Sequence, residues 1–189
     1  MKNYQKDFRF IVSELQETIN KLDDEFYKSL EVVINIFRET IISNRNILLC
    51  GNGGSAADCQ HMAAELVGRF KKERRPFRAI SLTTDSAILT CISNDFKYEE
   101  IFSRQIDAIG KKNDLLIAIS TSGKSPNILN ALLKAKEKDI KTISILGNKG
   151  GEAKQLSNNS IIVPSSCTAR IQEIHTLIIH IICEMLEDL

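Results

Sequence analysis

The stretch from Asn46 to Phe70, NILLCGNGGSAADCQHMAAELVGRF, constrains the fold more than any other part of the chain. It begins with an apolar run, Ile47 to Cys50, that is typical of a buried strand. A glycine-rich turn follows, and a helix opens at Ser55. Free backbone N–H groups at a helix N-terminus favour an anion or a polyhydroxyl ligand. The stretch therefore predicts a strand–turn–helix unit with a ligand site at the turn.

Apolar runs and helical patterns alternate along the rest of the chain. The further predicted strands cover residues 77–82, 114–120, 141–146 and 160–163. The predicted helices cover residues 3–22, a segment after the N-cap Asp23 that reaches Ile41, and residues 85–93, 98–109, 126–139 and 168–189. Asn94-Asp95 is expected to break the helical pattern. This alternation predicts βαβ units, a parallel sheet covered by helices on both faces, and ligands at the carboxyl ends of the strands.

The composition excludes several classes of protein. The chain has 189 residues, 43% of them hydrophobic and 26% charged, which fits one soluble globular domain. A net charge of +1 lacks the excess of basic residues that is typical of nucleic-acid-binding proteins. No apolar run approaches the length of a membrane span. The N-terminus lacks the apolar core of a signal peptide. We therefore expect neither nucleic acid nor membrane as a partner.

Two further composition features bear on location and surface. The five cysteines show no CxxC spacing, and most lie in apolar segments, so reduced buried thiols and a cytoplasmic location are expected. The densest basic run, Lys71-Lys72-Glu73-Arg74-Arg75, contains an acid. We interpret it as a solvated loop rather than a phosphate-binding patch.

A second polar loop, Ser120-Thr121-Ser122-Gly123-Lys124-Ser125, follows the apolar run DLLIAIS directly. Small hydroxyl groups around a glycine, at a helix N-terminus, can surround a phosphate with O–H and N–H donors. The loop does not match the Walker pattern, and the turn at residues 51–56 lacks the third glycine of a dinucleotide fingerprint. The pattern favours a phosphate site, while a serine-rich cap without a ligand is the alternative.

The three histidines lie on two helical segments. His61 and Glu65 are four residues apart and share a helix face. His180 lies in an apolar run, where an unpaired imidazole is costly. Imidazole and carboxylate both suit zinc, but a buried histidine is also a common core residue, so spacing leaves both readings open. Gln172 lies about 12 Å of helix rise from His180, so both would reach one ion only by leaning together or from neighbouring subunits.

The N-terminal residues 1–44 form a pair of amphipathic helices ahead of the sheet core at 45–189. One small sheet cannot cover both helices, so the first is a candidate for packing against another subunit. Packing on its own domain is the alternative that the pattern leaves open.

Four strings together resemble one enzyme family: CGNGGSAADCQHMAAELVGRF, the SND of residues 93–95, ISTSGKSPN and TARIQEIHTLIIH. They are similar to the phosphoheptose isomerases of the sugar isomerase (SIS) superfamily, over nearly the whole chain. The resemblance implies a single SIS domain over residues 1–189, with a three-layer α/β/α sandwich around a five-stranded parallel sheet. It also implies a homotetramer built through helices, one zinc ion per subunit, and conversion of sedoheptulose 7-phosphate to D-glycero-D-manno-heptose 7-phosphate. That product serves nucleotide-activated heptose for bacterial lipopolysaccharide core or capsule.

The resemblance also assigns roles to individual positions. The implied zinc ligands are His61, Glu65, Gln172 and His180, and the implied acid/base pair is Glu65 and His180. The implied substrate contacts, besides Glu65, are Asn52, Gly53, Gly54, Asn94, Asp95, Ser120, Thr121, Ser122, Ser125 and Gln172. Ala169 stands where some members of the family carry an aspartate, so the acidic group that those members have at this position is absent.

Two questions stay open at this point. Ketose–aldose isomerisation needs a base, an acid and a charge beside the developing oxyanion, and either Glu65 or His180 can be the base. A carboxylate that binds a metal is a poorer base, so the two roles of Glu65 conflict unless the substrate weakens its bond to the metal.

The competing function is a non-catalytic SIS tetramer that senses sugar phosphates or serves as a replication-initiator-associating scaffold. Such a protein would be expected to lose the metal and acid/base residues.

Overall fold

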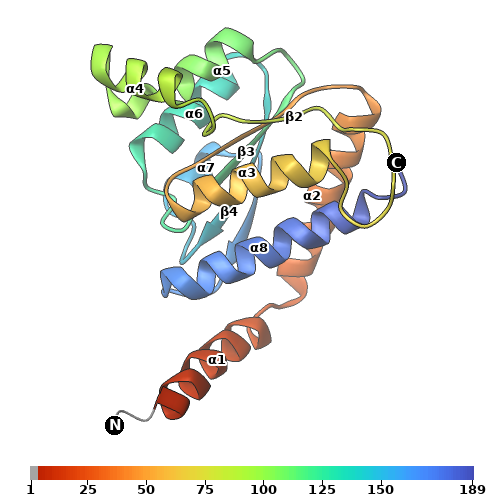
Figure 1. Cartoon of the computed structure of the whole chain (residues 1–189), viewed down its shortest axis with the longest axis vertical. Helices are drawn as coiled ribbons and strands as arrows, with labels where there is room; N and C mark the ends of the chain where they lie inside the picture. Colours follow the sequence, from red (N-terminus) through yellow and green to blue (C-terminus); the bar gives the residue numbers. More distant parts are fainter. Residues whose placement is uncertain (1–3) are drawn as a thin grey trace.

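The computed structural model describes residues 4–189, and a five-stranded parallel sheet lies at its centre (Figure 1). The strands are β1 (Ile47–Gly51), β2 (Ala79–Ser81), β3 (Leu115–Ser120), β4 (Lys141–Gly147) and β5 (Asn159–Val163). Their order across the sheet is β2-β1-β3-β4-β5, and all neighbours run parallel. Every residue of β1 and β3 is buried, as expected for central strands covered on both faces.

Helices cover both faces of the sheet and create two apolar cores. On one face, strand residues such as Ile117 and Ile145 pack with α2 (Asp24–Ile42), α3 (Gly54–Val67) and α8 (Thr168–Met185). The other face is covered by α4 (Ser86–Asp95), the 3₁₀ turn η1 (Tyr98–Glu100), α5 (Ser103–Ile109), α6 (Pro126–Glu137) and α7 (Ala153–Leu156). The predicted three-layer α/β/α sandwich is confirmed.

The first helix, α1 (Tyr4–Asn20), lies outside these layers and extends away from the sheet (Figure 1). It packs on α8, and Thr18 is its one buried residue within the described range. The predicted helix began at residue 3, which lies outside the described residues. Asp23 caps α2 as predicted, because its carboxylate accepts a hydrogen bond from the backbone N–H of Phe26 (2.9 Å). No helix within residues 4–189 is long and apolar enough to cross a bilayer.

Four predicted boundaries were wrong. Asn94 and Asp95 do not break a helix but form the last residues of α4, and Phe96 is its C-cap. The segment 98–109 is not one helix, because Ile101 and Phe102 are both buried and a turn lets adjacent side chains reach the same core. The short strand covers residues 79–81 instead of 77–82, and the terminal helix ends at residue 185 instead of 189.

A buried histidine on α8 makes the stability of the fold depend on pH. His175 has 0% exposure, and neither ring nitrogen makes a well-formed hydrogen bond. Burial lowers its pKa to about 4, although the nearby carbonyl of Leu146 acts in the opposite direction. In the unfolded chain its pKa is about 6.5. Between these values the unfolded chain binds a proton that the folded chain does not, so the free energy of unfolding falls as the pH is lowered.

We expect this histidine to lower the free energy of unfolding by up to about 3 kcal/mol between pH 6.5 and pH 4. Urea unfolding of the unaltered protein and of His175→Leu, each at several pH values, measures the difference. The variant should have the shallower dependence on pH in this window. Equal slopes would contradict the prediction.

Candidate active site

The two polar loops lie side by side at the carboxyl edge of the sheet. β1 ends at Gly51, which pairs with Ile119 at the end of β3, so the glycine turn and the serine loop leave neighbouring strands together. They enclose a small cavity of about 70 Å³. Its lining residues are Asn52, Ser55, Ile119, Ser120, Thr121, Ser122, Ser125 and Gln172. Six residues predicted as substrate contacts therefore share one cavity. The sequence predicts only that they lie at the same edge of the sheet.

The serine loop folds around a glycine that no other residue can replace without strain. Gly123 has a φ of +63°, and an added Cβ would overlap the carbonyl oxygen of Gly150 in the facing loop. Its N–H donates to Ser120 Oγ (3.0 Å). Ser125 is the N-cap of α6 but makes no side-chain cap hydrogen bond, so its hydroxyl stays available to a ligand. The arrangement fits the predicted phosphate site at the start of α6 better than a closed cap.

An amide pair joins the two loops. Asn52 Nδ2 donates to Asn127 Oδ1 (2.9 Å), and Asn127 Nδ2 donates back to Asn52 Oδ1 (2.8 Å). The Tyr98 hydroxyl, from η1, donates to the same Asn52 oxygen (3.1 Å). Asn127 is 2% exposed and stands in the first turn of α6. The Asn52 side chain is thus held by protein groups, and it fixes the glycine turn relative to the serine loop.

Replacing Tyr98 by phenylalanine is expected to raise the KM for the sugar phosphate that the sequence resemblance implies as substrate several-fold, with a smaller change in kcat. The variant removes the hydrogen bond that Tyr98 donates to Asn52 and leaves the amide pair intact. The expected loss is that of one neutral hydrogen bond, roughly 1 kcal/mol. Steady-state kinetics measures the effect, with Tyr27→Phe as a control at an exposed tyrosine on α2 that does not line the cavity. A KM equal to that of the unaltered protein would contradict it.

The helices α3 and α8 run parallel, and polar residues face each other along their contact. At one end, the Gln172 side chain lies against Gly54, where a Cβ would overlap its amide nitrogen. One turn further, the Thr176 hydroxyl donates to Asp58 Oδ1 (3.1 Å). Burial raises the pKa of Asp58, while the hydrogen bond from Thr176 and the proximity of His61 oppose the shift. We call this row of facing polar residues the α3–α8 seam.

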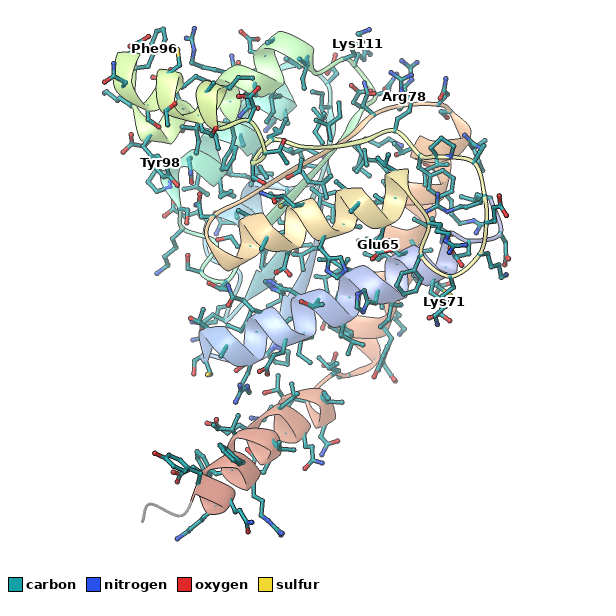
Figure 2. The ribbon with its side chains drawn as sticks, in the orientation of Figure 1. Glu65, Lys71, Arg78, Phe96, Tyr98 and Lys111 are labelled. Carbon is teal, nitrogen blue, oxygen red and sulfur yellow. The ribbon has the colours of Figure 1, made fainter. Side chains whose placement is uncertain are left out.

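His61, Glu65 and His180 meet at the far end of the seam. His61 Nε2 lies 3.2 Å from Glu65 Oε1 and 3.4 Å from His180 Nε2. The two imidazole rings are perpendicular, with centroids 5.0 Å apart, and Phe70 packs on the His180 ring with centroids at 5.4 Å. The side chains of His61 and Glu65 are 39% and 23% exposed, so the cluster is open to solvent or a ligand. Figure 2 shows Glu65 between α3 and α8.

The cluster does not amount to a finished metal centre. Among residues 4–189, no group of three or more histidine, cysteine, aspartate or glutamate side chains is already arranged around one point. Three donors that could turn to an ion are nevertheless adjacent, with His61 in contact with both others. Gln172 lies two turns of α8 before His180 and lines the serine-loop cavity.

Three further predicted substrate contacts do not line the cavity, although one of them, Gly53, lies in the glycine turn itself. Gly53 is the N-cap of α3, with φ +56° and open space around it. Asn94 and Asp95 are exposed at the end of α4, and neither lines the cavity. They bond to each other (2.8 Å), and hydrogen bonds from Asn94 and Cys91 lower the pKa of Asp95. Within a single chain these two residues are apart from the seam.

Sequence reasoning missed several residues around the site. Asp58, Tyr98, Asn127 and Thr176 contact the residues of the site or the amide pair beside it. Asp58 and Thr176 precede His61 and His180 by three and four residues, so helical spacing could have found them. Nothing in the sequence links Tyr98 to Asn52. A cavity of about 580 Å³ lies at the opposite edge of the sheet, beside Thr142 and Asn159, and none of its lining residues is a predicted site residue.

Comparison with known proteins identifies the fold and the family. Residues 11–147 match the family model of the SIS domain. The chain is 51% identical to a phosphoheptose isomerase of Helicobacter pylori over 172 residues, which cover 91% of this chain and 90% of that protein. A phosphoheptose isomerase of Nitratiruptor is 49% identical over 93% of this chain and 94% of its own length. The chain belongs to the phosphoheptose isomerase family.

Solved phosphoheptose isomerases share its whole architecture. The enzyme GmhA from Neisseria gonorrhoeae superposes with a TM-score of 0.93 at 34% identity, over 99% of this chain and 100% of that one. More distant structures, such as an RpiR transcription factor from Sphaerobacter thermophilus (TM-score 0.61, 14% identity), show only that the fold is shared. The resemblance noted in the sequence is therefore confirmed.

Proposed function

We infer that the chain is an aldose–ketose isomerase that converts sedoheptulose 7-phosphate to D-glycero-D-manno-heptose 7-phosphate. The observation that carries this inference is the meeting of Glu65, His61 and His180 in a chain about half identical to phosphoheptose isomerases. The product supplies nucleotide-activated heptose for bacterial lipopolysaccharide core or capsule. The scaffold or sensor reading is not favoured, because the named relatives are enzymes and the acid/base residues are present.

The serine-loop cavity is suited to the phosphate end of the substrate. Five hydroxyl residues line it, at the N-terminus of the twelve-residue helix α6: Ser55, Ser120, Thr121, Ser122 and Ser125. Hydroxyl and backbone donors together with the helix dipole can bind a phosphate without an arginine. Anchoring this end orients the reacting carbons of the sugar. Gln172, at the start of the seam, is placed to contact the same ligand.

Glu65 and His180 are suited to proton transfer at the other end. One takes a proton from C1 of the ketose, and an enediolate forms as the C2 carbonyl oxygen gains charge. Return of a proton to C2, with transfer of the O1 proton to O2, leaves the carbonyl at C1. His61 lies within 3.4 Å of both partners and holds them on the same side of the seam.

We propose one zinc ion per subunit at this cluster. Two imidazole nitrogens and a carboxylate are donors that zinc prefers, and separations of 3.2 and 3.4 Å match the edge of a tetrahedron with bonds of about 2.0–2.1 Å. His61, Glu65 and His180 would hold the ion. Gln172, two turns earlier on α8, would complete the set either by leaning towards His180 or from a neighbouring subunit. When bound, zinc polarises the carbonyl and hydroxyl oxygens at C1 and C2.

We also propose that the protein is a cytoplasmic homotetramer assembled through its N-terminal helices. α1 extends from the molecule and exposes large apolar side chains, among them Phe8, Phe10 and Val12. A helix face of this kind marks an association surface. The five cysteines are free, which favours a reducing compartment. Light scattering at micromolar concentration tests the assembly, and a monomer would overturn it.

The decisive experiment is a coupled assay of the purified protein with sedoheptulose 7-phosphate. We expect turnover that falls on chelation and returns with added zinc, together with zinc in elemental analysis. Heptose phosphate formation without any response to chelation would remove the metal from the proposal. Binding of the sugar phosphate without turnover, in zinc-supplemented protein, would favour the sensor reading instead.

A further inference from the structure

Residues 68–77 connect α3 to β2 and pass the C-terminal end of α8 (Figure 1). The sequence predicts a solvated loop for the basic run in this segment, and for Arg74 that prediction is wrong. The Arg74 side chain is only 5% exposed, and its guanidinium stacks on the Phe77 ring with 3.9 Å between Cζ and the ring centroid. A charged group is buried here only when the surrounding structure holds it.

Arg74 caps the last turn of α3. Its Nη2 donates to the carbonyl oxygen of Glu65 (2.7 Å), and its Nη1 donates to that of Leu66 (3.0 Å). α3 ends at Val67, so both carbonyls belong to the turn where intrahelical donors run out. A cation at this end also interacts favourably with the helix dipole. Arg74 therefore fixes the backbone from which the Glu65 carboxylate projects.

The same segment is tied to α8 on its other side. Glu187, whose side chain is 2% exposed, accepts hydrogen bonds at Oε2 from the backbone N–H groups of Lys71 (3.1 Å) and Lys72 (2.6 Å). Phe70, just before them, packs on the His180 imidazole. Figure 2 shows Lys71 beside the end of α8. One short segment thus contacts the elements that carry both Glu65 and His180.

Arg74 and Glu187 also face each other directly. Arg74 Nε and Glu187 Oε1 are both buried without a hydrogen-bond partner, and they lie 3.9 Å apart. A charge-assisted hydrogen bond needs about 2.7–2.9 Å, so the two atoms are about 1 Å from forming one. Opposite charges in a low-dielectric site attract strongly. Their attraction draws the ends of α3 and α8 together at the point where the acid/base pair meets.

We propose that Arg74 and Glu187 are positioning residues for the isomerase, acting through Glu65 and His180. This inference rests on the proposed function, because it needs those two residues to be the acid and the base. Proton transfer requires heavy atoms within about 2.6–3.2 Å of each other, and a misplacement of about 1 Å can cost on the order of 100-fold in rate. Arg74 sets the turn that bears Glu65, and Glu187 holds the segment that seats Phe70 on His180.

The test compares Arg74→Gln, Arg74→Lys and Glu187→Gln with Arg75→Gln. Arg75 is the adjacent arginine, is exposed, and has no hydrogen bond to α3. We expect Arg74→Gln to lower kcat by about 10- to 100-fold with little change in KM, and Arg74→Lys to recover part of the loss. Glu187→Gln keeps an acceptor for the two backbone N–H groups but loses the charge facing Arg74. It should lower kcat less, and Arg75→Gln should match the unaltered protein.

Hydrogen exchange supplies a readout that does not depend on turnover. The Gly68 N–H, bonded to the carbonyl of Ala64 (2.8 Å), reports the last turn of α3. Exchange there should become faster in Arg74→Gln and stay unchanged in Arg75→Gln. A lower melting temperature with unchanged kcat in the Arg74 and Glu187 variants would overturn the proposal. If the unaltered protein failed to turn over the heptulose phosphate, the proposed function would fall, while unchanged exchange in Arg74→Gln would overturn the positioning role by itself.

Discussion

Replacing Glu65 by glutamine is expected to reduce kcat for sedoheptulose 7-phosphate by about 100- to 10,000-fold, with little change in KM. Glutamine preserves the volume of the side chain but cannot accept or return a proton, and a positioned acid or base contributes about this factor. The serine loop, which we propose binds the phosphate end of the substrate, lies at the other end of the seam, and the substitution does not touch it. Steady-state kinetics with zinc-supplemented protein measures both constants.

His180→Gln provides the partner experiment. It should cause a loss of similar size, because base and acid act in one reaction, and the double variant should lose far less than the product of the two. Glu73→Gln, at an exposed glutamate in the segment after α3, is the matched control and should keep full activity. Full turnover in both Glu65→Gln and His180→Gln would refute the mechanism.

Replacing Gly123 by alanine is expected to be the most damaging change at the substrate end. The positive φ alone costs an alanine about 1–2 kcal/mol, and its Cβ would collide with the backbone of Gly150 in the facing loop. The collision displaces the serine loop, so KM should rise at least about tenfold and the free energy of unfolding should fall by more than about 2 kcal/mol.

Kinetics and urea unfolding of the same Gly123→Ala preparation check both effects. Lys149→Ala, an exposed position in the facing loop, alters the surface without placing a Cβ between the loops and should behave as the unaltered protein does. A Gly123→Ala variant with unchanged KM would show that the serine loop is not the phosphate site.

The layers of the fold follow from local patterns, and these were the safest predictions. The apolar runs at Ile47 and Leu115 are long enough to be read as buried central strands, and alternating helices then require a parallel sheet. The errors lie where tertiary contacts override a local pattern. Ile101 and Phe102 interrupt an expected helix because both side chains enter the core.

The candidate site was predictable in part for the same reason. His61 and Glu65 share a helix face by spacing alone, and their neighbour His180 was suggested by its need for a partner in an apolar run. Asn52 meets Tyr98 and Asn127, which lie 46 and 75 residues away in the sequence, and no local pattern records such pairs. Arg74 was misjudged because the charges around it gave no sign that Phe77 and the end of α3 would enclose it.

The α3–α8 seam limits the kinds of change that the two helices can accept in evolution. Gly54 with Gln172, Asp58 with Thr176 and His61 with His180 meet only because both helices run parallel and in step. Deleting one residue from either helix would rotate everything beyond it by about 100° and shift it by about 1.5 Å, which separates every later pair. Substitutions on the outer faces of α3 and α8 do not change how the two helices are aligned. Insertions and deletions are therefore expected to accumulate in the connecting loops and in α1, while the lengths from Gly54 to Glu65 and from Gln172 to His180 stay constant.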